Sequence, residues 1–204
     1  WAKRNKMTLN LTKTKEIIFR RSSARRSLVL PPLLPLVERV RSAQLLGVFI
    51  TDTLKFNEHV NYVLKQSCQR LYLLKLLRAQ GLPLHQLHTV CVAMLIRRIA
   101  YAICAWGDLC AAADVNRINS FLKRLVKYGY MSTVVDFQFC LNQADTRLFK
   151  SITRSNAHCL QTLLPALKPT AGRELRKRNH MYTLPAFRYE LFRKSFLLRC
   201  LYSS

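Results

Sequence analysis

Glycine is scarce in this chain, at five of 204 residues. An all-β fold needs many tight turns, and a phosphate-binding loop needs closely spaced glycines, so the scarcity argues against both. Half of the residues are hydrophobic, which is enough for a sizeable core, and the length suits one domain or two small ones. We therefore expect a folded and mainly helical protein.

Acidic residues are also scarce, since ten Asp and Glu stand against 34 Lys and Arg and give a net charge of +24. No two acids are adjacent or separated by a single residue, which argues against a catalytic metal site built from several carboxylates. The excess is largest at the ends, with +9 over residues 1–41 and +7 over 165–204. This balance predicts a polyanionic partner, and we favour contacts to nucleic-acid phosphates.

Paired cysteines and metal-binding motifs are missing. The seven cysteines show no C-x-x-C spacing, so we expect free, buried thiols in a reducing compartment. His85-x-x-His88-x-x-Cys91 is the one metal-like spacing, but a structural zinc site needs four ligands and helix packing is the favoured interpretation. His158 and Cys159 would point apart on a helix, so a nucleophile pair is disfavoured as well.

Targeting and membrane segments are not visible. The longest apolar run, residues 84–106, contains two histidines and two arginines, which argues against a membrane span. The chain opens at Trp1 on a basic stretch, so we expect it to be part of a longer protein. A nuclear or cytoplasmic location is expected.

Hydrophobic periodicity predicts a small antiparallel β patch followed by helices. The patch comprises a strand over 15–20 and a hairpin that pairs 37–40 with 44–50 across residues 41–43. Asn57, Asp145, glycines and prolines give the helix boundaries. The expected helices cover residues 57–81, 83–106, 114–128 and a segment from an N-cap at Asp145 to before Pro165, followed by a basic connector and tail.

Several motifs then follow one another in a familiar order. They are Asn10-x-x-Lys13-Thr14, Leu46-Gly47-Val48, FNEHVNYVLKQSCQRLYLLKLLRAQG at 56–81, IAYAICAWG at 99–107, Ala144-Asp145-x-x-Leu148-Phe149 and His158-Cys159-Leu160. Their order resembles the distal palm and thumb of non-LTR (LINE-type, jockey-like) retrotransposon reverse transcriptases. The resemblance covers nearly the whole chain.

The resemblance implies the C-terminal part of an RNA-directed DNA polymerase, with an RNA template and a DNA primer as partners. Residues 1–53 would be a palm remnant, 54–164 a helical thumb-like bundle and connecting region, and 165–204 a basic tail. Lys13 would match a lysine proposed to protonate the leaving pyrophosphate, as a general acid. Leu46, Gly47 and Val48 would form the primer grip. Contacts to the nucleic-acid backbone are expected from Lys15, Arg20, Arg21, Lys65, Arg70, Lys75 and Arg78.

The catalytic motif of that family is absent. Neither its aromatic-Ala-Asp-Asp turn nor its earlier Asp occurs in these residues. Mg²⁺ is implied for the parent enzyme, whose upstream fingers and palm would hold it, and no cofactor is expected in this chain. We therefore expect nucleic-acid binding without independent catalysis.

Two alternatives stay open. The same basic, helical character also fits a non-catalytic nucleic-acid-binding module that folds and functions by itself. A peripheral membrane protein would use the apolar and basic tail over 184–202 on anionic lipid. The second alternative is disfavoured, because the positive charge is spread over the whole chain.

Overall fold

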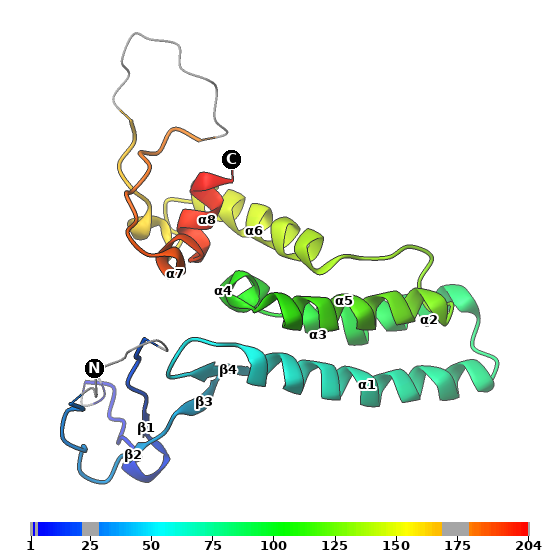
Figure 1. Ribbon diagram of the computed structural model, residues 1–204, viewed down its shortest axis with the longest axis horizontal. Coiled ribbons are helices and arrows are strands. Elements are labelled where there is room, and N and C mark those ends of the chain that lie inside the picture. Colours follow the sequence, from blue (N-terminus) through cyan, green and yellow to red (C-terminus); the bar gives the residue numbers. More distant parts are fainter. Residues whose placement is uncertain (1, 3, 22–28, 169–179, 204) are drawn as a thin grey trace. The chain divides into compact units, whose positions relative to one another are not determined.

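The computed structural model describes residues 2, 4–21, 29–168 and 180–203 (Figure 1). The chain divides into two compact units, Trp1–Tyr62 and Val63–Ser204, which are treated separately below. The predicted fold class, mainly helical with a small antiparallel strand pair near the N-terminus, is confirmed. The predicted basic segments around 22–28 and 169–179 lie outside the described residues.

The antiparallel pair in the first unit is a tight hairpin of β3 (Ser42–Leu45) and β4 (Val48–Thr51). Its two-residue turn is Leu46-Gly47, with φ of 47° and 84°. Two consecutive positive φ values are what a type I′ hairpin turn requires, and glycine adopts them readily. The predicted turn over 41–43 is therefore wrong, because the chain reverses at its glycine and places Ser42 and Ala43 in a strand.

A second strand pair is parallel and separate from the hairpin. After a 3-10 turn (η1, Leu11–Lys13), β1 (Lys15–Glu16) pairs with β2 (Glu38–Arg39). The predicted strand over 15–20 is thus too long, and its expected antiparallel pairing is wrong. Ion pairs between side chains help to set this pairing. Arg39 Nε lies 2.6 Å from Glu16 Oε2, and its guanidinium also donates to the carbonyls of Pro31 and Pro32.

The longest helix is α1 (Asn57–Ala79), close to its predicted range. Its buried face carries Val60, Val63, Ser67, Leu71 and Leu74, at the three- and four-residue steps of one helix face. Gly81 ends the helix as predicted. Its φ is 87°, and the bonds from Gly81 N to Arg78 O and from Leu82 N to Leu77 O form a Schellman motif.

The predicted single helix over 83–106 is interrupted. It consists of α2 (Leu84–Cys91), a π-helical turn (η2, Val92–Ile96), α3 (Arg97–Ile99) and α4 (Ile103–Trp106), followed by a 3-10 turn (η3, Gly107–Leu109). Ala102 breaks it with a φ of 51°. The indole Nε1 of Trp106 donates to Tyr101 O at 3.0 Å. A buried side chain thus supplies a hydrogen bond to a carbonyl at the helix break.

By length and composition, Leu84–Leu109 is apolar enough to cross a membrane, with a mean hydropathy of 1.6. A buried core helix passes the same test. In the second unit, one side of this segment is fully buried, through Leu87, Cys91, Leu95, Ile99, Ile103 and Trp106.

Two amphipathic helices follow, α5 (Ala112–Lys127) and α6 (Phe137–Arg154). Gly129 ends α5 with a φ of 74°, as expected. Asp136 caps α6 by accepting from the backbone N–H groups of Gln138 and Phe139. The predicted N-cap at Asp145 is therefore wrong, because this residue lies buried in the middle of α6. The helix also ends at Arg154 rather than shortly before Pro165, and only a 3-10 turn (η4, Gln161–Leu163) follows.

The described part of the predicted C-terminal tail contains short elements of secondary structure. A bridge pairs Leu167 with Tyr182, and two short helices follow, α7 (Glu190–Arg193) and α8 (Phe196–Tyr202). Leu198, Cys200 and Leu201 of α8 are buried, and α8 packs on α6. These three residues of the proposed apolar and basic tail thus belong to the core of the second unit, while Leu191 and Phe192 of α7 are exposed.

Candidate nucleic-acid interface

The acidic side chains of the described chain are all engaged. Of the ten acids, only Glu174 lies outside the described residues. Glu58 accepts from Ser42 Oγ and Asp136 caps α6. Seven others form ion pairs, namely Glu16, Glu38, Asp52, Asp108, Asp114, Asp145 and Glu190. Internal partners therefore occupy the acids, and most of the positive charge has no acid of the described chain to offset it.

The outward face of α5 is basic. Its buried face carries Ile118, Phe121, Leu122 and Leu125. At 100° per residue, the basic residues fall within about a third of a turn on the opposite side. These are Arg117, Lys123, Arg124 and Lys127, all exposed. Arg117 is held by Asp114 at 2.9 Å and Arg124 stacks over Phe121 at 5.4 Å, so Lys123 and Lys127 are the charges of this face that project into solvent.

A second basic row runs along α6. Arg147, Lys150 and Arg154 are exposed at steps of three and four residues, which places them on one face. The same face begins with Phe139, whose ring is 59% exposed, and a shallow depression of about 450 Å³ lies against Phe139, Arg147 and Lys150. An exposed ring beside amides and cations suits contact with nucleic acid, because it offers both stacking and phosphate contacts.

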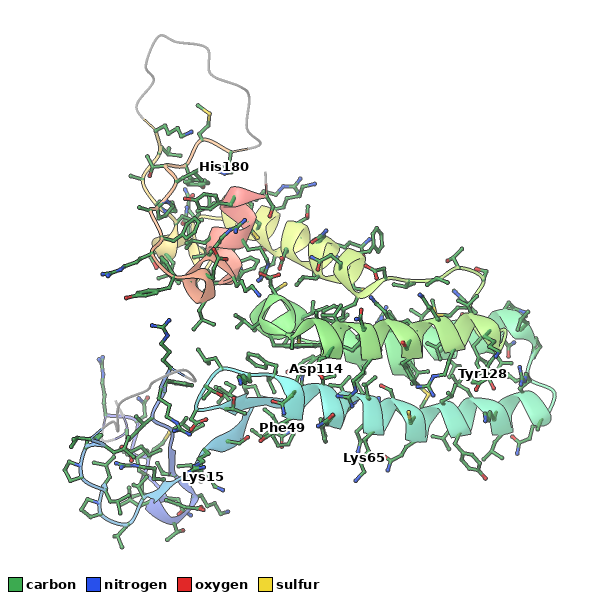
Figure 2. The ribbon with its side chains drawn as sticks, viewed as in Figure 1. Lys15, Phe49, Lys65, Asp114, Tyr128 and His180 are labelled. Carbon is green, nitrogen blue, oxygen red and sulfur yellow. The ribbon has the colours of Figure 1, made fainter. Side chains whose placement is uncertain are left out.

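The basic residues that the sequence predicts on α1 have mostly internal contacts. Arg70 Nη1 donates to Met94 O at 3.1 Å, and Arg78 Nη1 donates to Tyr128 O at 2.6 Å. Lys75 lies over the Tyr128 ring, 5.6 Å from its centroid. Figure 2 shows Tyr128 between α1 and α5, and Lys65 projecting from α1 on the side away from α5. Lys65 is thus the predicted α1 contact that is most accessible, and the other three stay predictions with an added packing role.

The predicted residues of the first unit are spread over its surface. Lys13 is exposed at the end of η1, where Asn10 Oδ1 accepts from its backbone N–H. Lys15 pairs with Glu38 at 3.4 Å and Arg20 with Asp52 at 2.7 Å, while Arg21 is exposed. The predicted primer-grip residues form the hairpin tip, where Leu46 is 83% exposed, Gly47 is exposed and Val48 is buried at 8%. A protruding apolar tip is compatible with contact to a partner.

The described residues contain no cluster of three or more metal-ligating side chains. Hard divalent cations need several oxygen ligands that converge, and in the described segments no three His, Cys, Asp or Glu side chains converge on a possible metal. Helix packing was the favoured interpretation of His85, His88 and Cys91; Cys91 is buried, whereas His85 and His88 are exposed on α2. The described acids are also engaged by partners within the chain, as given above. We therefore derive no chemical step through a metal on this chain.

The cysteines form no disulfide. Cys91, Cys110 and Cys200 are buried as expected, whereas Cys68 and Cys159 are exposed, against expectation. Burial raises the pKa of Cys91 to about 11 and, helped by nearby acids, that of Cys110 and Cys200 to about 12. These three thiols are protonated at neutral pH. His158 and Cys159 lie in a turn rather than on the predicted helix.

Arg199 contacts four parts of the second unit, and no sequence motif predicted this role. Its Nε and Nη2 bind Asp145 of α6 at 2.7 and 2.9 Å, and Nη2 also donates to Cys104 O in α4. Nη1 donates to Lys194 O and lies 4.0 Å from Asp108. Burial lowers the pKa of Arg199, but its hydrogen bonds to Asp145 and the nearby charges outweigh this effect and raise that pKa.

A cavity of about 850 Å³ lies beside this ion pair, between α6, α8 and the Leu167–Tyr182 bridge. Three aromatic rings line it: Phe149 lies 6.2 Å from His180 and 6.4 Å from Tyr182, and the last two lie 5.8 Å apart. His180, labelled in Figure 2, is buried at 7%. Asn142, Thr146 and Lys150 of α6 also line the cavity. Sequence reasoning missed it, because its walls come from four separate segments between Asn142 and Ser203.

Comparison with protein-family models, with curated proteins and with solved structures finds no match to this chain.

Proposed function

We propose that this chain binds nucleic acid along its phosphate backbone, as the C-terminal part of a reverse transcriptase of the non-LTR retrotransposon type. The strongest support is that the acidic side chains of the described residues interact with partners inside the chain. Because the described acids have partners within the chain, the exposed lysines and arginines of α5 and α6 are left to attract a polyanion. The order of the sequence motifs supports the assignment to a reverse transcriptase.

The spacing of the α6 row suits a phosphate backbone. Arg147 and Arg154 lie seven residues apart, which is about 10 Å along a helix at 1.5 Å per residue. One strand of a duplex advances 3.4 Å per phosphate along its axis, so the row spans about three phosphates. Lys and Arg that reach phosphates give affinity without reading the sequence. The proposed binding is therefore to the backbone and is largely indifferent to base sequence.

Lys123 and Lys127 provide the most direct test of the interface. We expect the double variant Lys123→Ala/Lys127→Ala to bind a blunt duplex more weakly. Its slope of log affinity against log salt should be shallower by about 2, since each lost phosphate contact removes about 0.9. Fluorescence anisotropy at several salt concentrations measures both. The control Lys123→Arg/Lys127→Arg keeps the charge and should bind with the affinity of the unsubstituted chain. An unchanged slope in the alanine variant would contradict the role of α5.

A non-catalytic module that stands by itself is the second candidate. The Arg199 network favours it, because a buried ion pair that joins α4, α6 and α8 gives the second unit a closed core of its own. Sequencing the transcript upstream of the Trp1 codon distinguishes the two. An open frame that continues into an aromatic-Ala-Asp-Asp motif is expected for the polymerase. A stop codon directly before Trp1 would support the module and remove the polymerase assignment.

A further inference from the structure

We propose that the cavity between α6, α8 and the Leu167–Tyr182 bridge takes an unpaired nucleobase of the bound nucleic acid. This inference rests on the proposed function and adds a site for a single-stranded segment. The volume of the cavity, about 850 Å³, falls within the range of about 300–1,000 Å³ typical of small-molecule sites. It therefore has room for one nucleotide.

The aromatic wall is the first argument. Phe149, His180 and Tyr182 give the cavity three ring systems within 6.4 Å of one another. Every base has a flat π-face, so a base can stack on such a wall whatever its identity. Asn142 and Thr146 supply amide and hydroxyl groups for the base edge.

Hydrogen bonds orient one ring of this wall, that of His180. His180 Nε2 lies 2.8 Å from Leu201 O, and Nδ1 accepts from Tyr182 N at 3.2 Å. A carbonyl accepts and a backbone N–H donates, so these partners place the ring proton on Nε2 and fix the orientation of the ring. A ring fixed in advance loses little freedom when a ligand stacks beside it.

The charge around the cavity is the second argument. The one described acid that lines it, Asp145, accepts hydrogen bonds from Nε and Nη2 of Arg199, so no unopposed carboxylate repels a nucleotide. Lys150 lines the cavity and also belongs to the basic row on α6. A nucleic-acid backbone bound along this row therefore lies next to the cavity, and an unpaired base of that strand can enter it.

The test compares blunt duplexes with duplexes that carry a short unpaired overhang, bound to the full chain and followed by anisotropy. We expect the overhang to tighten binding by about fivefold or more, the lower end of what one base–aromatic stack contributes. Tyr182→Leu removes a ring, and Ser203→Trp fills the cavity from its exposed rim. Both should lose the overhang preference while still binding blunt duplex. The control Tyr72→Leu, at an exposed ring on α1, should keep it, and circular dichroism checks that each variant is folded.

The outcomes separate the two proposals. Binding of blunt duplex with no overhang preference overturns the cavity and leaves the backbone proposal standing. A preference that survives in both Tyr182→Leu and Ser203→Trp also overturns the cavity. Binding that requires the overhang and is absent for blunt duplex supports the cavity and contradicts the backbone proposal. Absence of any binding overturns both. DNA and RNA overhangs run in parallel show whether the 2′-hydroxyl is read.

Discussion

Arg199 connects several elements of the second unit through one buried side chain. It is mostly buried, with a side-chain exposure of 11%, and Asp145 has 9%. A buried ion pair is costly to assemble, and removing one partner leaves the other charge buried without compensation. Arg199 therefore acts as a constraint on how α4, α6 and α8 come together more than as a source of net stability.

Asp145→Ala should lower the free energy of unfolding by about 3–5 kcal/mol, because Arg199 would stay buried without its carboxylate. Chemical denaturation followed by circular dichroism measures the change. The matched control is Glu190→Ala, which breaks a pair at the surface with Arg193 and should cost less than about 1 kcal/mol. Equal effects of the two variants would contradict the assigned role of Asp145.

Cysteine burial predicts a loss of stability at high pH. The pKa of Cys104 and that of Cys200 are raised from 9.0 to about 12, first by burial and then by Asp145. Between pH 9 and 12 the unfolded chain therefore binds fewer protons than the folded one, and stability falls as the pH rises. The melting temperature should decline over this range. Cys200→Ala should decline less steeply, and Cys68→Ala, which changes an exposed thiol, should follow the parent.

The roles of single residues could be predicted where they depend on local backbone geometry, and could not where they depend on partners far away in the sequence. Gly81 and Gly129 were found because a helix end that needs a positive φ selects glycine locally. Asp145 was taken for an N-cap because its actual partner, Arg199, lies 54 residues away. The α1 arginines were predicted as nucleic-acid contacts for the same reason, since their carbonyl partners on Met94 and Tyr128 are distant in sequence.

Among the elements, the helices were predicted better than the strands. The buried faces of α1 and α5 follow from a period of 3.6 residues, which is visible in the sequence. The parallel pairing of β1 with β2 was not visible, because two-residue strands carry no periodic pattern. The break at Ala102 has no glycine or proline to mark it, although a local contact, the bond from Trp106 Nε1 to Tyr101 O, accompanies it.

The end of α5 gives a prediction at the scale of elements. Gly129 N donates to Val126 O and Tyr130 N donates to Leu125 O, the Schellman pattern that requires a left-handed residue at Gly129. Gly129→Ala should destabilise the protein by about 1–2 kcal/mol through backbone strain, since open space surrounds the position. Gly129→Asn should cost less, because asparagine tolerates positive φ. Thermal denaturation ranks the three proteins, and equal stability would contradict this cause.

For the whole molecule, charge is the dominant property. The net charge of +24 was visible in the sequence, but the sequence did not show which of the basic side chains are exposed and free of internal contacts. The structure shows acids held by internal partners, three of the predicted α1 cations packed against the chain, and exposed rows on α5 and α6. The central proposal is that these rows bind nucleic-acid phosphates.

The salt dependence of binding tests this proposal most directly. Affinity of the full chain for a blunt duplex is measured by anisotropy across a series of salt concentrations. Five exposed cations, Lys123, Lys127, Arg147, Lys150 and Arg154, at about 0.9 per phosphate contact, predict a log–log slope of about −4 or steeper. An affinity that is independent of salt, or no measurable binding at low salt, would contradict the account.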